Sequence, residues 1–490
     1  MLFSSLIFLY AFLPFVLLGN ILIQPRYRNK FLLIASLIFF AWGGASYTLV
    51  FIGSILVNYF GGLLISRFEN KPRQKKVSLI ITVVINLAVL CIFKYADFIT
   101  ENINLLRDLF DKAPLDKPDI SLPIGISFYT FHGISYIIDV YRGATKPQRK
   151  LTDLGLYLSF FPQLIAGPIV RYKDVASQLS DREFSASGFN NGMYRFLMGL
   201  AKKVLIANTL AVLADNAFKI HPADMETSMA WLGIIAYTFQ LYFDFSGYSD
   251  MAIGLALTFG FKFKENFNYP FIAQNMSDFW RRWHISLSTW ILDYLYTPLS
   301  ISTRFWGKFG TIFSLNIAFF LAGLWHGASW NFAIFGMLNG IALSYDVLTR
   351  KLRKKIASSV PALIYSRISI ALTFFYWMMC LVFFRANTFD HAIDYYATMF
   401  GFSGTNHSFF QTLWKAINPE QLAAFLIAIV GSFGMLNFIV RFFDNVKGKT
   451  PALILNIADL AKLAFSLYLL IICTEYLLVG TYNPFIYFRF

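Results

Sequence analysis

The chain has 490 residues, of which 57% are hydrophobic and 14% charged, and its formal net charge is +15. One soluble core cannot hide this much apolar side chain, so the surplus must face lipid and a soluble globular protein is excluded. The basic residues lie in short clusters between apolar runs, as the positive-inside rule predicts for cytoplasmic loops. We therefore expect membrane lipids around the protein and no nucleic acid. The three cysteines lie inside apolar runs, so no metal site is expected.

Apolar runs and charged loops alternate from the first residue onward. The run 1–23 has no basic residue before it, whereas a basic cluster at 26–30 follows it, which predicts an N-terminus outside the cell. Residues 31–66 are too long for one crossing of about 20 residues, and the glycines at 43–44 offer a break. We therefore predict two helices there, with both ends in the cytoplasm.

The next loops keep the same alternation of charge. The run 77–98 leads outward to the loop 101–119, which has a net charge of −2, and the run 120–141 returns to a cluster at 142–150 with a net charge of +4. Further connections are assigned outside or inside by the same rule: outside at 224–226 and 385–421, and inside at 262–264, at 350–355 and at Arg441, Lys447 and Lys449. This pattern predicts about 12 crossings, with the C-terminal tail outside.

Three apolar segments do not fit simple crossings. Residues 151–168 contain two prolines and a glycine near their end, which favours a re-entrant segment buried in protein. Residues 269–300 mix tryptophans with charged side chains, a pattern typical of an interface or a cavity wall. Residues 309–345 are long enough for two crossings, with a break near His326.

These observations predict an all-α, polytopic integral membrane protein with about 12 transmembrane helices plus re-entrant and interfacial helices. No soluble domain or long linker is evident in the sequence. We therefore predict one membrane-embedded domain over residues 1–490, with a motif-rich catalytic core at about 120–348.

His326 is the first candidate for chemistry, because an ionisable side chain inside an apolar span needs a partner, a cavity or a function. It lies at the predicted break, about 25 Å along the span from its cytoplasmic end. Gly323 and Gly327 leave space beside it for a substrate. The alternative is a structural histidine bonded to a carbonyl or to Asn331, but its depth favours function. A neutral imidazole is well suited to take a proton from a hydroxyl group.

A second group of polar residues lies at 278–288. If this segment is helical, Trp280 and His284 lie one turn apart on one face. Arg281 and Arg282 then point elsewhere, where they bind either the phosphates of a donor or lipid headgroups. Taken alone, the arginines favour the headgroups.

Two carboxylates, Asp244 and Asp250, lie within the apolar run around 242–250. They indicate a cation site, the lining of a polar cavity, or an internal network that closes onto other helices. The internal network is at least as well supported as the functional alternatives.

Several catalytic motifs are absent from the sequence: a Gly-x-Ser-x-Gly elbow, HExxH, a Walker motif and GxGxxG. A covalent serine mechanism therefore has no support. Direct transfer with histidine as base remains, as does passage through an acceptor that another protein supplies.

Together, the motifs resemble the membrane-bound O-acyltransferase family, most closely its bacterial branch of alginate O-acetyltransferase-like membrane subunits. The segments that carry the resemblance extend over nearly the whole chain: Ser159–Ile169, Tyr242–Ala252, Asn268–Phe271, Phe279–Ser288, Gly323–Ala328 and Asn483–Phe488. Their order makes a coincidence improbable.

The resemblance implies an O-acyltransferase in the bacterial cytoplasmic membrane, with His326 as the catalytic histidine and His284 as the second family histidine. It implies no tightly bound cofactor, acetyl-CoA as a donor substrate, and an extracytoplasmic, SGNH-hydrolase-like acetyltransferase as partner. The final acceptor is then a polysaccharide or cell-wall glycan such as alginate or peptidoglycan. Six further residues are expected to bind the donor or to line the cavity: Arg281, Arg282, Trp325, Asp278, Asp244 and Asp250.

Two other functions fit parts of the pattern. A D-alanyl transfer subunit for teichoic acid shares the histidine motifs of the family but takes its group from a carrier protein. An ion-coupled transporter would also place carboxylates and broken helices near the middle of the membrane. The loss of surface esters on substitution of His326 distinguishes transfer from transport.

Overall fold

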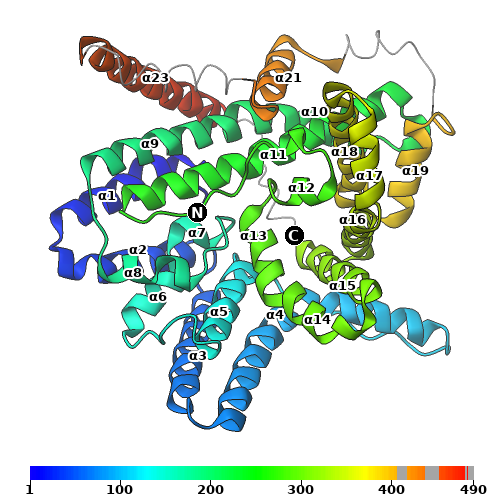
Figure 1. The fold of residues 1–490 in the computed structure, drawn as a ribbon. Helices are drawn as coiled ribbons and strands as arrows, with labels where there is room; N and C mark the ends of the chain where they lie inside the picture. Colours follow the sequence, from blue (N-terminus) through cyan, green and yellow to red (C-terminus); the bar gives the residue numbers. More distant parts are fainter. Residues whose placement is uncertain (405–415, 436–451, 481–482, 484–490) are drawn as a thin grey trace. The chain divides into compact units, whose positions relative to one another are not determined.

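The computed structural model describes residues 1–404, 416–435, 452–480 and 483, without the side chains of 452–459, and within these residues it is helical and contains no strand (Figure 1). The predicted all-α class is therefore confirmed. Most of the predicted inner loop around Arg441, Lys447 and Lys449, and the tail after Asn483, lie outside the described residues. The chain divides into two compact units: residues 1–193 with 252–264, and residues 194–251 with 265–490. The prediction of one domain stays a prediction.

Seven helical segments in the described residues are long and apolar enough to cross a membrane. They are α3 (Tyr47–Arg67), α4 (Pro72–Asp108), the stretch Ala186–Lys219, α15 (Lys308–His326), α16 (Trp330–Leu348), α18 (Ala362–Arg385) and Leu460–Leu478 within α23 (Ala452–Leu478). Phe8–Leu22 and α21 (Pro419–Ser432) are shorter apolar helices. A multi-pass membrane protein is thus confirmed, while the number of about 12 crossings stays a prediction.

The first unit is built from α1 to α8, with the start of α9 (Ala186–Ala201) and the end of α11 (Thr227–Thr258). The remaining helices have these bounds: α1 Leu13–Leu22, α2 Arg28–Ala41, α5 Ile126–Tyr141, α6 Leu151–Ser159, α7 Phe161–Leu164 and α8 Tyr172–Ser180. The predicted break near 43–44 is confirmed between α2 and α3. Two predicted bounds need correction, because α4 continues to Asp108 through the first half of the predicted loop 101–119, and α5 has 16 residues, fewer than a straight crossing needs.

Close helix contacts in the first unit are bridged by polar side chains. Asn58 on α3 and Asn86 on α4 exchange amide hydrogen bonds of 3.0 and 3.2 Å, and both are buried. Gly133 on α5 lies so close to Asn58 that a Cβ there would be 2.6 Å from its amide nitrogen. Small residues and paired amides of this kind hold helices together where lipid supplies no hydrophobic drive.

The predicted re-entrant segment, residues 151–168, is largely buried and is broken into short helices. Helix α6 ends at Ser159, α7 has four residues, and the backbone beyond Leu164 is not helical up to α8. His132 accepts a hydrogen bond from the Val170 amide at 3.2 Å, and the Tyr157 hydroxyl donates to the Val170 carbonyl at 2.9 Å. Side chains thus satisfy backbone groups that a helix would have paired.

The second unit holds the remaining helices, many of them short. Their bounds are α10 Asn208–Lys219, α12 Met276–Trp280, α13 Ile285–Ile291, α14 Thr297–Ser302, α17 Arg350–Ser359 and α19 Phe389–Met399, with π-helical turns at Lys202–Ala207 and Leu292–Tyr296. Helix α19 lies inside the predicted exterior connection 385–421. Helices α15 and α16 form the predicted hairpin, and the break after His326 is confirmed.

Candidate active site

His326 is the last residue of α15 and is 7% exposed. Its depth follows from the helix, because 18 residues at 1.5 Å each put it about 27 Å from Lys308. The chain is extended at Gly327, and α16 begins at Trp330. The hairpin thus places one imidazole at its turn, as the sequence predicted.

Glycines allow α15 and α16 to approach closely beside His326. A Cβ on Gly323 would collide with the Phe332 carbonyl, and one on Gly336 would collide with the Phe319 carbonyl. Because both obstacles are backbone atoms, neither could move aside cheaply. Asn331 donates its amide to the Ala386 carbonyl at 2.9 Å, which ties the start of α16 to the end of α18.

His284 lies between α12 and α13 and is fully buried. Its φ is 45°, in the left-handed region that few non-glycine residues adopt. The conditional prediction of one helix through Trp280 and His284 is therefore wrong, since α12 ends at Trp280 and α13 begins at Ile285. Residues held in such backbone conformations cluster at functional sites.

A hydrogen-bond network fixes the orientation of the His284 ring. Nδ1 lies 3.2 Å from Asn266 Oδ1, which also accepts hydrogen bonds from the amide and hydroxyl of Ser286. Asn266 in turn donates to Ser249 at 2.9 Å. Because Asn266 Oδ1 accepts, Nδ1 carries the proton. Nε2 is buried and has no hydrogen-bond partner among the described residues, so its lone pair faces the interior.

The two histidines lie on either side of Trp325. Its ring centroid is 4.8 Å from that of His326 and 6.3 Å from that of His284. Phe245 contacts His284 edge to face, and Phe384 contacts His326. Burial, with a smaller effect of nearby His326, lowers the pKa of His284 well below its usual value, so this ring is neutral at pH 7.

The two carboxylates of α11 form ion pairs within the second unit. Asp244 pairs with Lys203 at 2.8 Å, and both side chains are 2% exposed. Asp250 pairs with Lys202 at 2.6 Å and with Arg195 at 2.8 Å. These pairs match the internal network that the sequence left open. A role of either carboxylate in binding donor stays a prediction.

The remaining predicted residues lie on and just after α12. Asp278 accepts a hydrogen bond from Arg282 Nε at 3.1 Å and lies 3.8 Å from Arg281. The Arg281 side chain is 71% exposed, so this guanidinium is open to a ligand. Sequence analysis did not single out Asn266, because nothing in its local sequence predicts that it bonds a histidine 18 residues away.

Comparison with known proteins agrees with these features. A family model described as MBOAT, membrane-bound O-acyltransferase family, matches residues 150–385. The probable alginate O-acetylase AlgI of Pseudomonas putida is 39% identical over 100% of this chain and 100% of that protein. The peptidoglycan O-acetyltransferase of Helicobacter pylori is 32% identical over 100% of this chain and 98% of its own length. The teichoic acid D-alanyltransferase of Bacillus subtilis is 33% identical over 47% of this chain and 60% of that protein.

The apolar helices are those of a multi-pass membrane protein, and the relatives aligned over the whole chain are named as enzymes that transfer acetyl groups. The chain belongs to the membrane-bound O-acyltransferase family, and it is an O-acyltransferase.

Proposed function

We propose that this enzyme takes an acetyl group from a cytoplasmic thioester, acetyl-CoA, and passes it across the inner membrane for O-acetylation of an extracytoplasmic polysaccharide or cell-wall polymer. An SGNH-hydrolase-like partner outside the membrane completes the transfer. The observation that carries the proposal is the pair of buried imidazoles beside Trp325. Relatives named for alginate and for peptidoglycan acetylation, each aligned over the full chain, support acetyl as the group.

His326 acts as the base in this mechanism. Its imidazole takes the proton of the acceptor hydroxyl while that oxygen attacks the thioester carbonyl carbon. The tetrahedral intermediate then collapses, the C–S bond breaks, and the departing thiolate takes up the proton.

In this scheme His284 orients the reacting groups beside His326 or passes on a proton. Its Nε2 is available as an acceptor, because Asn266 holds the proton on Nδ1. A ring fixed in one tautomer by its neighbour is the arrangement that catalytic and metal-bound histidines share.

D-alanyl transfer to teichoic acid is a second candidate, supported by the relative from Bacillus subtilis, which aligns with about half of this chain. We rank it lower because the relatives named as acetyltransferases align over the whole chain.

The experiment purifies each envelope polymer from cells with and without the gene and measures acetate and D-alanine released by mild base. We expect acetate to disappear from one polymer in the deletion strain and to return on complementation. Loss of D-alanine instead would establish the second candidate, and unchanged esters on every polymer would reject acyl transfer to the envelope.

A further inference from the structure

Two arginines, Arg28 and Arg182, lie close together in the first unit, where the start of α2 meets the chain after α8. Arg182 donates a hydrogen bond from Nη1 to the side chain of Asn29, the residue that follows Arg28. The Arg28 guanidinium lies 5.5 Å from the centre of the Phe184 ring, and that of Arg182 lies 4.6 Å from the centre of the Phe261 ring. Ring contacts of this kind hold a guanidinium in place without satisfying its N–H groups.

Each member of this arginine pair has a buried N–H group that lacks an acceptor. Arg28 Nε and Arg182 Nη2 are buried, and neither has a hydrogen-bond partner among the described residues. Removing a charged N–H group from water without giving it an acceptor is costly. The pair therefore calls for a ligand that brings oxygen acceptors.

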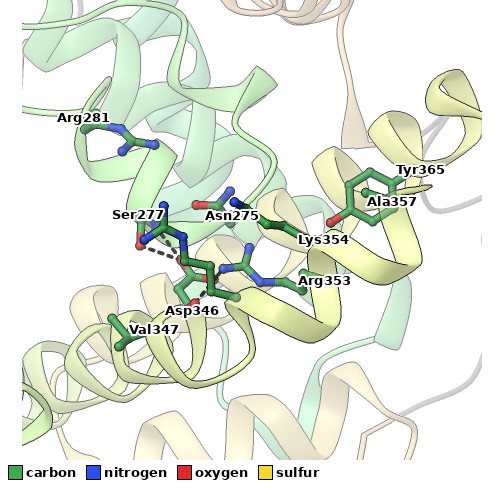
Figure 2. A pocket seen from close by; sticks show the side chains of 10 residues that line it. Asn275, Ser277, Arg281, Asp346, Val347, Arg353, Lys354, Ala357 and Tyr365 are labelled. Atoms are coloured by element: carbon green, nitrogen blue, oxygen red, sulfur yellow. Dashed lines mark hydrogen bonds and ion pairs between the residues drawn. The ribbon is translucent and has the colours of Figure 1, made fainter. Parts of the chain in front are cut away.

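Arg353 of the second unit shows how a half-buried arginine is usually satisfied. Figure 2 shows it in a pocket beside Asp346, with which it forms an ion pair at 3.2 Å. The arginine pair forms no ion pair within the part of the chain that the structure describes. Asp153 attracts Arg182 electrostatically, but its carboxylate accepts a hydrogen bond from Asn29 at 2.9 Å instead. The chain thus supplies a neutral amide where other arginines have a carboxylate.

The two positive charges also repel each other. Burial and the neighbouring Arg28 lower the pKa of Arg182 to about 10, and the attraction of Asp153 offsets them only in part. The first turn of α2 adds Lys30 and contains no acidic residue, so no side chain there balances the positive end of the helix dipole. A negative charge bound between the arginines would relieve the repulsion and stabilise the cationic form of Arg182.

The residues just before the arginine pair are those of a membrane surface. Helix α1 ends at Leu22, and Leu18 and Leu22 are exposed one turn apart. Tyr27 is also exposed, and the Arg26 guanidinium lies 4.6 Å from the centre of its ring. Exposed leucines followed by an interfacial tyrosine and basic side chains mark the level of the lipid headgroups. The acceptor oxygens that this level offers are those of lipid phosphates.

We propose that Arg28 and Arg182 bind the phosphate of an anionic phospholipid in the leaflet that faces the predicted cytoplasmic loop 26–30. A guanidinium presents its N–H groups as a planar fork that matches phosphate oxygens. Arg26 and Lys30, both exposed, add charge that attracts an anionic headgroup. The bound lipid joins the start of α2 to the chain after α8 and takes no part in acyl transfer.

The test measures binding of phosphatidylglycerol to the full-length protein in detergent by native mass spectrometry. The double variant Arg28→Gln/Arg182→Gln removes both charges of the pair. The matched control, Arg67→Gln/Arg73→Gln, removes two exposed arginines at the ends of α3 and α4 in the same unit. We expect the first variant to weaken phosphatidylglycerol binding about tenfold and the control to change it by less than about twofold. Equal losses in the two variants, or unchanged binding in the first, would overturn the proposal.

A second variant, Arg28→Met, separates binding from folding. It removes one of the two repelling charges and keeps a flexible side chain that packs against the Phe184 ring. In detergent without lipid, this protein should unfold at the same temperature as the wild type or at a higher one. The rise in unfolding temperature that phosphatidylglycerol gives the wild type should be lost. A lower unfolding temperature without lipid, together with a normal rise on adding it, would give Arg28 a structural role only and contradict the proposal.

Soluble probes distinguish a lipid from a free anion. Inorganic phosphate and glycerophosphoglycerol carry the same phosphate chemistry without acyl chains, and phosphatidylcholine carries it with a compensating ammonium group. Phosphatidylglycerol should bind more tightly than phosphatidylcholine, and neither soluble probe should displace it. Displacement by either soluble probe would identify a site for free phosphate compounds and reject the lipid. Equal binding of phosphatidylcholine would reject selection by charge.

The lipid site is independent of the proposed function. The His326→Ala protein should bind phosphatidylglycerol as the wild type does, and weaker binding in that protein would contradict the placement of the site at the arginine pair. Retained polymer esters in a His326→Ala strain bear on acyl transfer alone. Failure of one proposal is therefore distinguishable from failure of the other.

Discussion

The Asn266 side chain determines which nitrogen of His284 can act. It accepts from Nδ1 at 3.2 Å and is itself fixed by Ser249 and Ser286. The backbone supports the same arrangement, because the Ile285 amide donates to the Asn266 carbonyl at 2.9 Å. Sequence reasoning found the histidine from its cost in an apolar region. It could not find the amide, because their pairing exists only in the folded chain.

Asn266→Ala should lower the rate of acetyl transfer about 10- to 100-fold, because the ring loses its fixed tautomer. Asn266→Asp keeps an acceptor and should recover much of the rate. A carboxylate beside the ring favours the imidazolium and raises the pKa of His284, so the acid limb of the pH–rate profile should move to higher pH. A merely structural role would change thermal stability in both variants and leave the pH profile in place.

The Lys203–Asp244 ion pair is expected to contribute to stability, because both side chains are buried. Breaking a buried ion pair costs about 3–5 kcal/mol, whereas replacing both partners is often tolerated. Asp244→Asn and Lys203→Met should each lower the midpoint of thermal unfolding in detergent. The Asp244→Leu/Lys203→Met protein should unfold at a higher temperature than either. Single variants that unfold normally but lose transfer would instead give Asp244 a direct part in the reaction.

The α15–α16 hairpin shows what pattern and length can predict. Its two helices followed from an apolar stretch too long for one crossing, and its turn followed from the glycines around His326. The break at His284 could not be predicted in the same way, because no helix propensity places histidine in the left-handed region. Tertiary contacts decide that conformation. The length of α5 could not be predicted either, because this 16-residue helix lies in an apolar run of ordinary composition.

Gly336→Ala should disrupt this hairpin. A Cβ there would collide with the Phe319 carbonyl and lie 2.9 Å from Gly323 Cα, so α16 must move away from α15 and from His326. We expect lower thermal stability and loss of transfer. Gly53→Ala on α3 is the matched control, since a Cβ at Gly53 would have nothing within 4 Å. It should be neutral or stabilising by about 0.5–1 kcal/mol. Full activity in Gly336→Ala would show that close packing of the hairpin is dispensable.

The orientation of the whole chain in the membrane stays a prediction from loop charge. Lys351→Cys at the start of α17 should react with an impermeant maleimide only in permeabilised cells, whereas Asp116→Cys should react in intact cells, because the two loops lie on opposite sides. Both positions are exposed, so access to the reagent depends on the side of the membrane. If both cysteines reacted from the same side of the membrane, the predicted topology would be wrong. The side from which the donor enters would then have to be assigned again.

The most direct test of acyl transfer through His326 uses cells in which the only copy of the gene carries His326→Ala. The measurement is the amount of acetate that mild base releases from their envelope polymer. His221→Ala, which changes an exposed histidine outside the site, is the control, and membrane levels of both proteins are matched by immunoblot. We predict that esters fall to the level of the deletion strain with His326→Ala and stay at the wild-type level with His221→Ala. Wild-type esters in the His326→Ala strain would contradict the assignment of His326 as the catalytic base.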